Sequence, residues 1–173
     1  MGARLGRAGD RDLAELYRRH VPGAVRLAYL MTGDQVLAED LAQEAFVRLT
    51  GRFAHIRNPD AFPAYLRRTV VNLVKNHYRR LGVERTHLDS YGHLSPPNDD
   101  LPDGVTEGIL REALLGLPYR QRAAIVLRYY EDLPERRIAE LLGCRPGTVK
   151  SLLSRGLASL RAEISLALEP EHE

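Results

Sequence analysis

The sequence predicts an all-α protein, with two small helical domains joined by a flexible acidic linker and a helix-turn-helix at the end of the second. Apolar residues recur at three- and four-residue steps along most of the chain, and no segment shows the sustained period-two alternation of a strand. Residues 82–104 (GVERTHLDSYGHLSPPNDDLPDG) replace this period with prolines, glycines and acids. We therefore expect one domain over residues 10–81 and another over residues 105–168.

The charged residues are unevenly distributed, although the net charge of the 173 residues is only +2. Residues 1–80 carry 14 Lys and Arg against 8 Asp and Glu, whereas residues 81–110 carry 1 against 6. Residues 111–173 are nearly balanced, at 10 against 9. Two cation-bearing segments thus flank an acidic middle, and this asymmetry says more about the partners of the chain than its total charge does.

Several classes of protein are disfavoured by what the sequence lacks. No apolar run approaches the roughly 18 residues of a membrane span and no signal segment opens the chain, so we expect a cytoplasmic protein without membrane insertion. Cys144 is the only cysteine, which excludes an internal disulfide and a multi-cysteine metal site. The sequence also lacks a P-loop, a dinucleotide fingerprint, a nucleophile elbow and a paired-histidine zinc helix. We expect no metal, no cofactor and no enzyme activity.

The first domain is expected to hold helical stretches over residues 10–32, 34–49 and 58–81. Pro22 interrupts the first stretch, which predicts a kinked helix or two helices. Residues of capping type stand at the three starts, namely Asp10, Asp34 and Asn58. In the second domain we expect a short helix ending at Gly116, a mostly buried one from Pro118 to Tyr130, and a third capped by Asp132.

The stretch over residues 34–49 has two unlike faces. One is apolar, with Leu37, Leu41, Ala45, Phe46 and Leu49. The other is an acidic stripe that includes two valines, namely Val36, Asp40, Gln43, Glu44 and Val47. A purely solvated face seldom needs β-branched apolar residues, because they are mediocre helix formers. The spacing alone leaves two interpretations open, which are a solvated face with incidental valines and a docking surface for a basic partner.

The stretch over residues 58–81 alternates amides and cations on the face opposite its apolar residues. These polar residues are Arg68, Asn72, Lys75, Asn76 and Arg79. Cations neutralise phosphates and Asn amides can bond base edges, so this face suits a nucleic acid. A solvated basic face is the alternative.

Residues 133–160 (LPERRIAELLGCRPGTVKSLLSRGLASL) predict two helices joined by a tight turn. Gly143 ends the first helix and Pro146 stands in the first turn of the second, which runs to about Leu168. Apolar residues share one face of the second helix, and the residues that point away are Thr148, Lys150, Ser151, Ser154 and Arg155. This helix-turn-helix shape lets the second helix enter the DNA major groove, although a helical hairpin with a solvated outer face would share the pattern.

Three stretches together resemble bacterial RNA polymerase sigma factors of the extracytoplasmic-function type. RLAYLMTGDQVLAEDLAQEAFVRL resembles the family's core-binding helix pair, and FPAYLRRTVVNLVKNHYRR resembles its promoter −10 helix. LPYRQRAAIVLRYYEDLPERRIAELLGCRPGTVKSLLSRGLASLR resembles its fourth domain, which ends in the −35 recognition helix. The order, the spacing and the acidic linker make the combination specific, and it covers most of residues 10–165.

The resemblance implies roles for individual residues. Core RNA polymerase would dock through its clamp helices on Asp40, Gln43, Glu44 and Val47. Promoter DNA at the −10 element, with a base flipped into the loop at residues 52–58, would meet Arg52, His55, Asn58, Arg68, Asn72, Lys75, Asn76, Arg79 and Arg80. Promoter DNA at the −35 element would meet Arg145, Thr148, Lys150, Ser151, Ser154 and Arg155. The resemblance also implies an anti-sigma factor as a further partner.

Two positions depart from the family's pattern. Arg145 stands where the family often has a Ser that caps the recognition helix, and Leu152 stands where it often has an Arg beside the groove. We expect these positions to alter the −35 preference. A stand-alone helix-turn-helix regulator, whose first domain senses a ligand or dimerises, is the alternative function.

Overall fold

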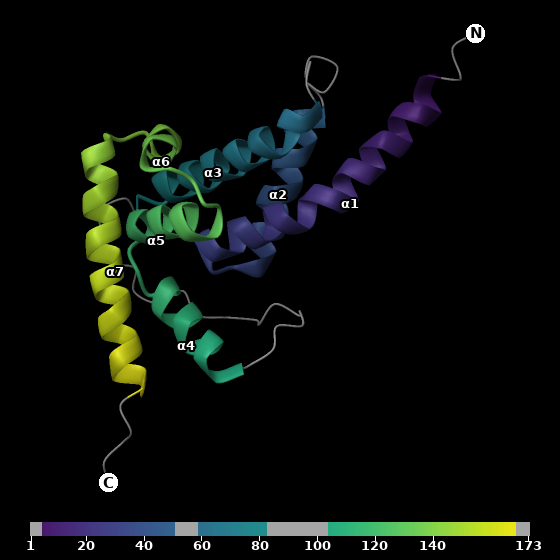
Figure 1. Cartoon of the computed structure of the whole chain (residues 1–173). Helices are drawn as coiled ribbons and strands as arrows, with labels where there is room; N and C mark the ends of the chain where they lie inside the picture. The colour runs from purple at the N-terminus through teal and green to yellow at the C-terminus, as the bar shows by residue number, and fades with distance from the viewer. Residues whose placement is uncertain (1–4, 51–58, 83–103, 169–173) are drawn as a thin grey trace.

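The computed structural model of the chain describes residues 5–50, 59–82 and 104–168, with side chains from residues 13, 60 and 108 onward in these ranges. Helices and short turns make up all of these residues, which confirms the predicted all-α class (Figure 1). A first helical group holds α1 (Leu5–Thr32), α2 (Gln35–Thr50), the 3-10 turn η2 (Pro59–Ala61) and α3 (Phe62–Arg80). A second helical group holds α4 (Gly104–Leu115), α5 (Tyr119–Ile125), the π-helical turn η3 (Val126–Tyr130), α6 (Glu135–Leu142) and α7 (Pro146–Leu168). The predicted linker lies almost entirely outside the described residues.

The first helical group packs around an aromatic centre. Phe62, at the start of α3, is fully buried, and its ring meets that of Phe46 from α2 at a centroid distance of 5.8 Å. Tyr17 from α1 packs edge-on against Phe46 at 5.1 Å, so one aromatic chain ties all three helices together. The predicted cap at Asp34 is confirmed, because its Oδ1 accepts a hydrogen bond of 3.0 Å from the backbone N–H of Leu37.

Three predicted helix boundaries are wrong. α3 begins at Phe62 with Ala61 as its N-cap, because the residues from Pro59 form the 3-10 turn instead of its first turn. α1 begins at Leu5 rather than at Asp10, and it continues through Pro22 as a single helix. Proline removes only one backbone donor, and buried neighbours such as Val21 and Ala24 hold the helix on both sides of it. α6 begins after Pro134 and not after a side-chain cap at Asp132, whose φ of 49° places it in the left-handed region instead.

In the second helical group, one glycine allows a left-handed turn and another allows two helices to approach closely. Gly143 ends α6 with a φ of 66°, and the N–H of Cys144 returns to the carbonyl of Ala139 at 3.0 Å, as predicted for this turn. Gly156 lets α7 pack directly on α5, because a Cβ there would lie 2.8 Å from Cδ1 of Ile125. The recognition helix is therefore fixed to α5 at its middle.

The two helical groups also pack against each other and share one hydrophobic core. α6 lies against α3, and α5 and η3 lie against α1 (Figure 1). Tyr78, near the end of α3, stacks on Tyr119, at the start of α5, with ring centroids 4.2 Å apart. The helices that carry the candidate DNA-binding residues are thus held in a single arrangement.

Candidate functional surfaces

The acidic stripe of α2 lies on the side of the helix that faces away from the core. All five of its members are exposed, namely Val36, Asp40, Gln43, Glu44 and Val47. Val36 and Val47 are 70% and 67% exposed, although burying a side chain of this size contributes about 1.5 kcal/mol or more. Glu44 pairs with Arg48 one turn along, and such an exposed pair contributes little, so its carboxylate stays available to a partner. The stripe offers carboxylates and apolar contact area on one face.

α3 concentrates positive charge without any acid. Its cations are Arg67, Arg68, Lys75, Arg79 and Arg80. Arg68, Arg79 and Arg80 are exposed, whereas the remaining predicted contacts in α3 are half-buried, namely Asn72, Lys75 and Asn76. The loop residues predicted to meet DNA, which are Arg52, His55 and Asn58, lie outside the described residues. A helix with cations only attracts an anionic chain such as the DNA backbone.

The recognition face of α7 is open along its first half. Every predicted contact is exposed, namely Arg145, Thr148, Lys150, Ser151, Ser154 and Arg155. Lys150, Ser151, Ser154 and Arg155 line one shallow hollow on the helix surface. No acidic residue occurs from Pro146 to Ala162, so hydrogen-bond donors dominate this face. Phosphate oxygens and the major-groove edge of guanine are acceptors, so a DNA-binding face needs such donors.

Of the two positions that depart from the family's pattern, one faces the core. Leu152 is only 6% exposed and belongs to the hydrophobic core, so the expectation that it stands beside the groove is wrong. Leu152 and Leu153 are both buried because α7 packs on more than one neighbouring helix, which widens its apolar face beyond a single stripe. Arg145 is exposed just before α7 and stays a candidate for an altered −35 preference.

A buried arginine joins the two helical groups. Arg122, in α5, is 3% exposed, and its Nε donates to the carbonyl of Met31 at the end of α1 at 2.9 Å. Its Nη2 donates to the Tyr78 hydroxyl at 3.0 Å, and its Nη1 donates to the carbonyls of Leu115 and Leu117 at 2.6 and 3.4 Å. Burial lowers the pKa of Arg122. Its hydrogen-bond acceptors are carbonyl oxygens and a hydroxyl, and it forms no ion pair with a carboxylate among the described residues.

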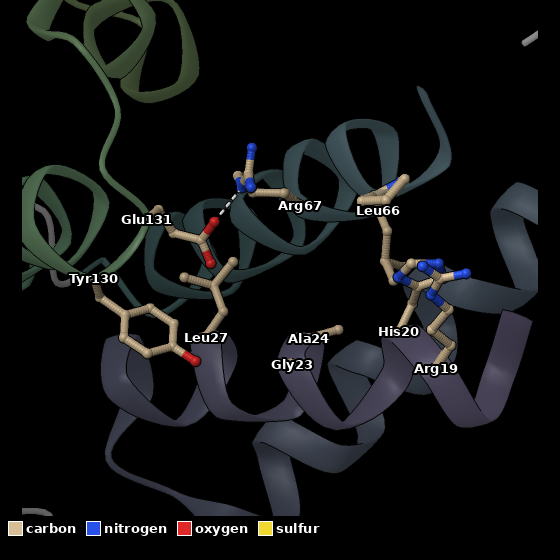
Figure 2. Close-up of a pocket in the computed structure, with 10 residues that line it drawn as sticks. Arg19, His20, Gly23, Ala24, Leu27, Leu66, Arg67, Tyr130 and Glu131 are labelled. Carbon is tan, nitrogen blue, oxygen red and sulfur yellow. Dashed lines mark hydrogen bonds and ion pairs between the residues drawn. The ribbon is translucent and has the colours of Figure 1, made fainter. Parts of the chain in front are cut away.

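Two further contacts from the second helical group reach cations of α3. Glu131, directly after η3, forms an ion pair with Arg67 that is only partly exposed (Figure 2). Nζ of Lys75 lies 3.4 Å from the carbonyl oxygen of Leu141, in the last turn of α6. A helix C-terminus carries partial negative charge, so this end of α6 suits an ammonium. In each contact, an oxygen atom of the second helical group meets a cation of the first helical group.

The ion pair borders a pocket of about 180 Å³ between α1, α3 and η3. His20 and Arg19 line one end of it, and Tyr130 and Glu131 line the other (Figure 2). Burial lowers the pKa of the His20 imidazole, and the Arg19 charge lowers it further. Tyr130 is 43% exposed rather than buried as predicted, because it stands at this rim with Arg26 over its ring.

Neither a metal site nor a membrane span is found in the described parts of the chain. No cluster of three or more His, Cys, Asp and Glu residues could hold a metal ion there. None of the helices there is both long and apolar enough to cross a membrane.

Sequence reasoning missed the residues that join the two helical groups, namely Arg67, Tyr78, Arg122 and Glu131. Arg122 gave no local signal, because it follows the polar pair Arg120 and Gln121 and directly precedes the apolar run of α5. Arg67 and Glu131 are 64 positions apart, and no local pattern predicts that they meet. Their roles follow from the packing alone.

The chain is similar to known proteins over both helical groups. The family model for sigma-70 region 2 matches residues 16–83, and the model for sigma-70 region 4 matches residues 107–160. The RNA polymerase sigma-E factor of Streptomyces coelicolor is 33% identical over 153 residues, which cover 88% of this chain and 86% of that protein.

The ECF RNA polymerase sigma factor SigE of Mycolicibacterium smegmatis is 36% identical over an aligned region. That region covers 85% of this chain and 59% of that protein.

A solved structure shares the fold. The sigma factor RpoE of Bartonella quintana, crystallised with the anti-sigma factor NepR, matches with a TM-score of 0.67 and 20% identity, over 90% of this chain and 98% of that one.

The chain belongs to the extracytoplasmic-function group of RNA polymerase sigma factors. It directs promoter-specific initiation by RNA polymerase, and the stand-alone regulator is not favoured.

Proposed function

We propose that three surfaces divide the work of this sigma factor. The stripe on α2 binds core RNA polymerase, α3 binds the −10 element, and the exposed face of α7 binds the −35 element. The observation that carries the proposal is the separation of charge, with exposed carboxylates on α2 and acid-free cationic faces on the two DNA helices. The functional division then follows residues 10–81 and 105–168.

On the stripe, Asp40 and Glu44 supply charge, Gln43 supplies hydrogen bonds, and Val47 supplies apolar contact. An interface that mixes an apolar centre with charged residues gains specificity and association rate from its complementary charges. The partner surface would be basic with apolar recesses. Such a surface on the clamp of the polymerase's largest subunit would leave both DNA helices free.

On the DNA helices, cations position the phosphates and polar side chains read the bases. Arg79 and Arg80 end α3, while Asn72 and Asn76 present amides one turn apart between them and the helix start. In α7, Lys150 and Arg155 reach phosphates or guanine edges, and hydroxyls of neighbouring serines add short contacts. Each helix alone offers few contacts, so affinity arises when the polymerase holds both on one promoter.

Further parts of the proposal concern partners and setting. An anti-sigma factor is a further partner, as NepR is for the RpoE sigma factor of Bartonella quintana in their complex. The chain acts in the cytoplasm, where RNA polymerase lies, and it works by binding without a cofactor or chemistry of its own.

The test is charge reversal on the stripe. Asp40→Arg and Glu44→Arg should each weaken binding to core polymerase by about tenfold or more, because each places a cation against a basic partner. Glu39→Arg is the matched control, since Glu39 is exposed on the same helix but off the stripe. Affinity is measured by titrating labelled chain with sigma-free core. Equal affinity of the stripe variants and the control would show that the stripe is not the docking surface.

A further inference from the structure

The pocket between α1, α3 and η3 combines apolar walls with a polar rim (Figure 2). Ala24 and Leu27 of α1 and Leu66 of α3 form the apolar part, and all three side chains are buried. The volume of about 180 Å³ exceeds the roughly 150 Å³ of an apolar cavity that binds benzene. The space therefore suits one compact apolar group, such as a single six-membered ring.

Gly23 keeps part of this space open. It lines the pocket from α1, and a Cβ there would meet nothing within 4 Å. Glycine destabilises the interior of a helix relative to alanine, and at this position neither a positive φ nor a close helix contact requires it. A larger side chain at residue 23 would enter the pocket without displacing a neighbour.

The rim of the pocket is cationic at one end and neutral at the other. Arg67 and Glu131 neutralise each other in their ion pair. At the opposite end, Arg19 is exposed and forms no ion pair among the described residues (Figure 2). Burial and the charge of Arg19 lower the pKa of His20, so at neutral pH its imidazole is uncharged and offers one N–H donor. A guanidinium with an imidazole N–H beside it suits a carboxylate.

We propose that this pocket binds a small carboxylate with a compact apolar body, of the size and class of benzoate. The ring lies against Ala24, Leu27 and Leu66, and the carboxylate accepts hydrogen bonds from Arg19 and His20. Because both helical groups line the pocket, the ligand also stabilises their packing. The pocket shares no residue with the stripe or with the predicted DNA contacts, so the proposal does not depend on the functions assigned to them.

The first test titrates the full chain with sodium benzoate at constant ionic strength and pH 7.5. NMR of the histidine side chains, with the His20 signal assigned by His20→Gln, measures occupancy at the site itself. We expect a saturable shift of this signal, half complete at about 1–10 mM, and a rise in Tm with added benzoate. Benzylamine keeps the ring but is a cation, and acetate keeps the carboxylate without the ring. Each should bind at least about fivefold more weakly, because it lacks one of the two recognised features.

The second test repeats the benzoate titration with variants of the pocket. Gly23→Leu should abolish the His20 shift, because its side chain fills the open space, while the Tm without benzoate stays equal or rises. Arg19→Ala should weaken binding by about two- to fivefold. Arg18→Ala is the control and should bind as the parent does, since it removes the same charge from an exposed neighbour outside the pocket.

Four outcomes would each overturn the proposal. They are the lack of a saturable His20 shift, benzylamine or acetate binding as tightly as benzoate, unimpaired binding by Gly23→Leu, and equal affinity of Arg19→Ala and Arg18→Ala.

Discussion

Tyr78 and Tyr119 stack across the boundary between the two helical groups, with ring centroids 4.2 Å apart and planes inclined by 19°. The Tyr78 hydroxyl accepts a hydrogen bond from Arg122 and lies 3.3 Å from the carbonyl oxygen of Thr32. Stacking and hydrogen bonding thus act on one side chain, which is 5% exposed. The two helical groups are therefore held together at this point by contacts that are buried from solvent.

Tyr78→Phe should therefore destabilise the chain by about 1–3 kcal/mol, because it leaves a buried Arg122 donor without its acceptor while it keeps the ring in place. The free energy of unfolding, measured with urea at neutral pH, checks this expectation. Tyr65→Phe is the control, since Tyr65 is 48% exposed. Equal stability of the two variants would contradict the role assigned to the hydroxyl.

The same tyrosine predicts a pH dependence on the alkaline side. Burial raises the pKa of Tyr78 above its ordinary value of 10.0. The charge and the hydrogen bond of Arg122 act in the opposite direction, but their effect is smaller. The unfolded chain therefore ionises first, so the stability that Tyr78 contributes is complete below pH 10.0 and is lost as the pH rises through the folded pKa. Unfolding titrations from pH 9 to 11 should show a smaller loss for Tyr78→Phe than for the parent.

His20 predicts the opposite dependence on the acid side. Burial and Arg19 lower its pKa below 6.5, and its ring lies 5.5 Å from that of Phe62. Since the unfolded chain takes up a proton first, the contribution of His20 is complete above pH 6.5 and is lost as the pH falls through the folded pKa. Thermal melts from pH 7.5 to 5.0 should fall less steeply for His20→Gln than for the parent. Parallel curves would show that this imidazole does not titrate on unfolding.

The contact of α7 with α5 predicts a steric effect. Gly156→Ala should cost about 1–3 kcal/mol, because its Cβ would lie 2.8 Å from Cδ1 of Ile125 and 3.2 Å from Cβ of Gln121. Gly147→Ala, in the same helix, meets nothing within 4 Å and should be neutral or mildly stabilising. Urea unfolding of both variants provides the comparison, and equal stability of the two variants would contradict a steric conflict with Cβ of Gln121.

The −35 assignment predicts a salt-dependent loss. Lys150→Ala and Arg155→Ala should each weaken holoenzyme binding to promoter DNA and reduce the slope of affinity against salt by about one, as expected for one lost phosphate contact. Arg161→Ala is the control, since Arg161 is exposed beyond the hollow of α7. An unchanged salt slope in both variants would show that Lys150 and Arg155 do not contact DNA.

Local patterns predicted much of this structure. The apolar spacing of α2, the Asp34 cap, the Gly143 turn and the exposed polar face of α7 all follow from residues close in sequence. The errors share one cause, which is tertiary packing. Pro22 stays inside α1 because its neighbours are buried, and Leu152 is buried because α7 touches more than one helix. The contacts of Arg122 and Glu131 span the two groups and leave no local signal.

Transcription reconstituted from sigma-free core polymerase and the purified chain tests the central claim most directly. A pool of genomic promoter fragments serves as template, and the transcript starts are sequenced. We expect transcripts with defined starts that appear only when the chain is present and that diminish sharply with Asp40→Arg. Absence of chain-dependent transcripts together with no binding to core polymerase would contradict the account.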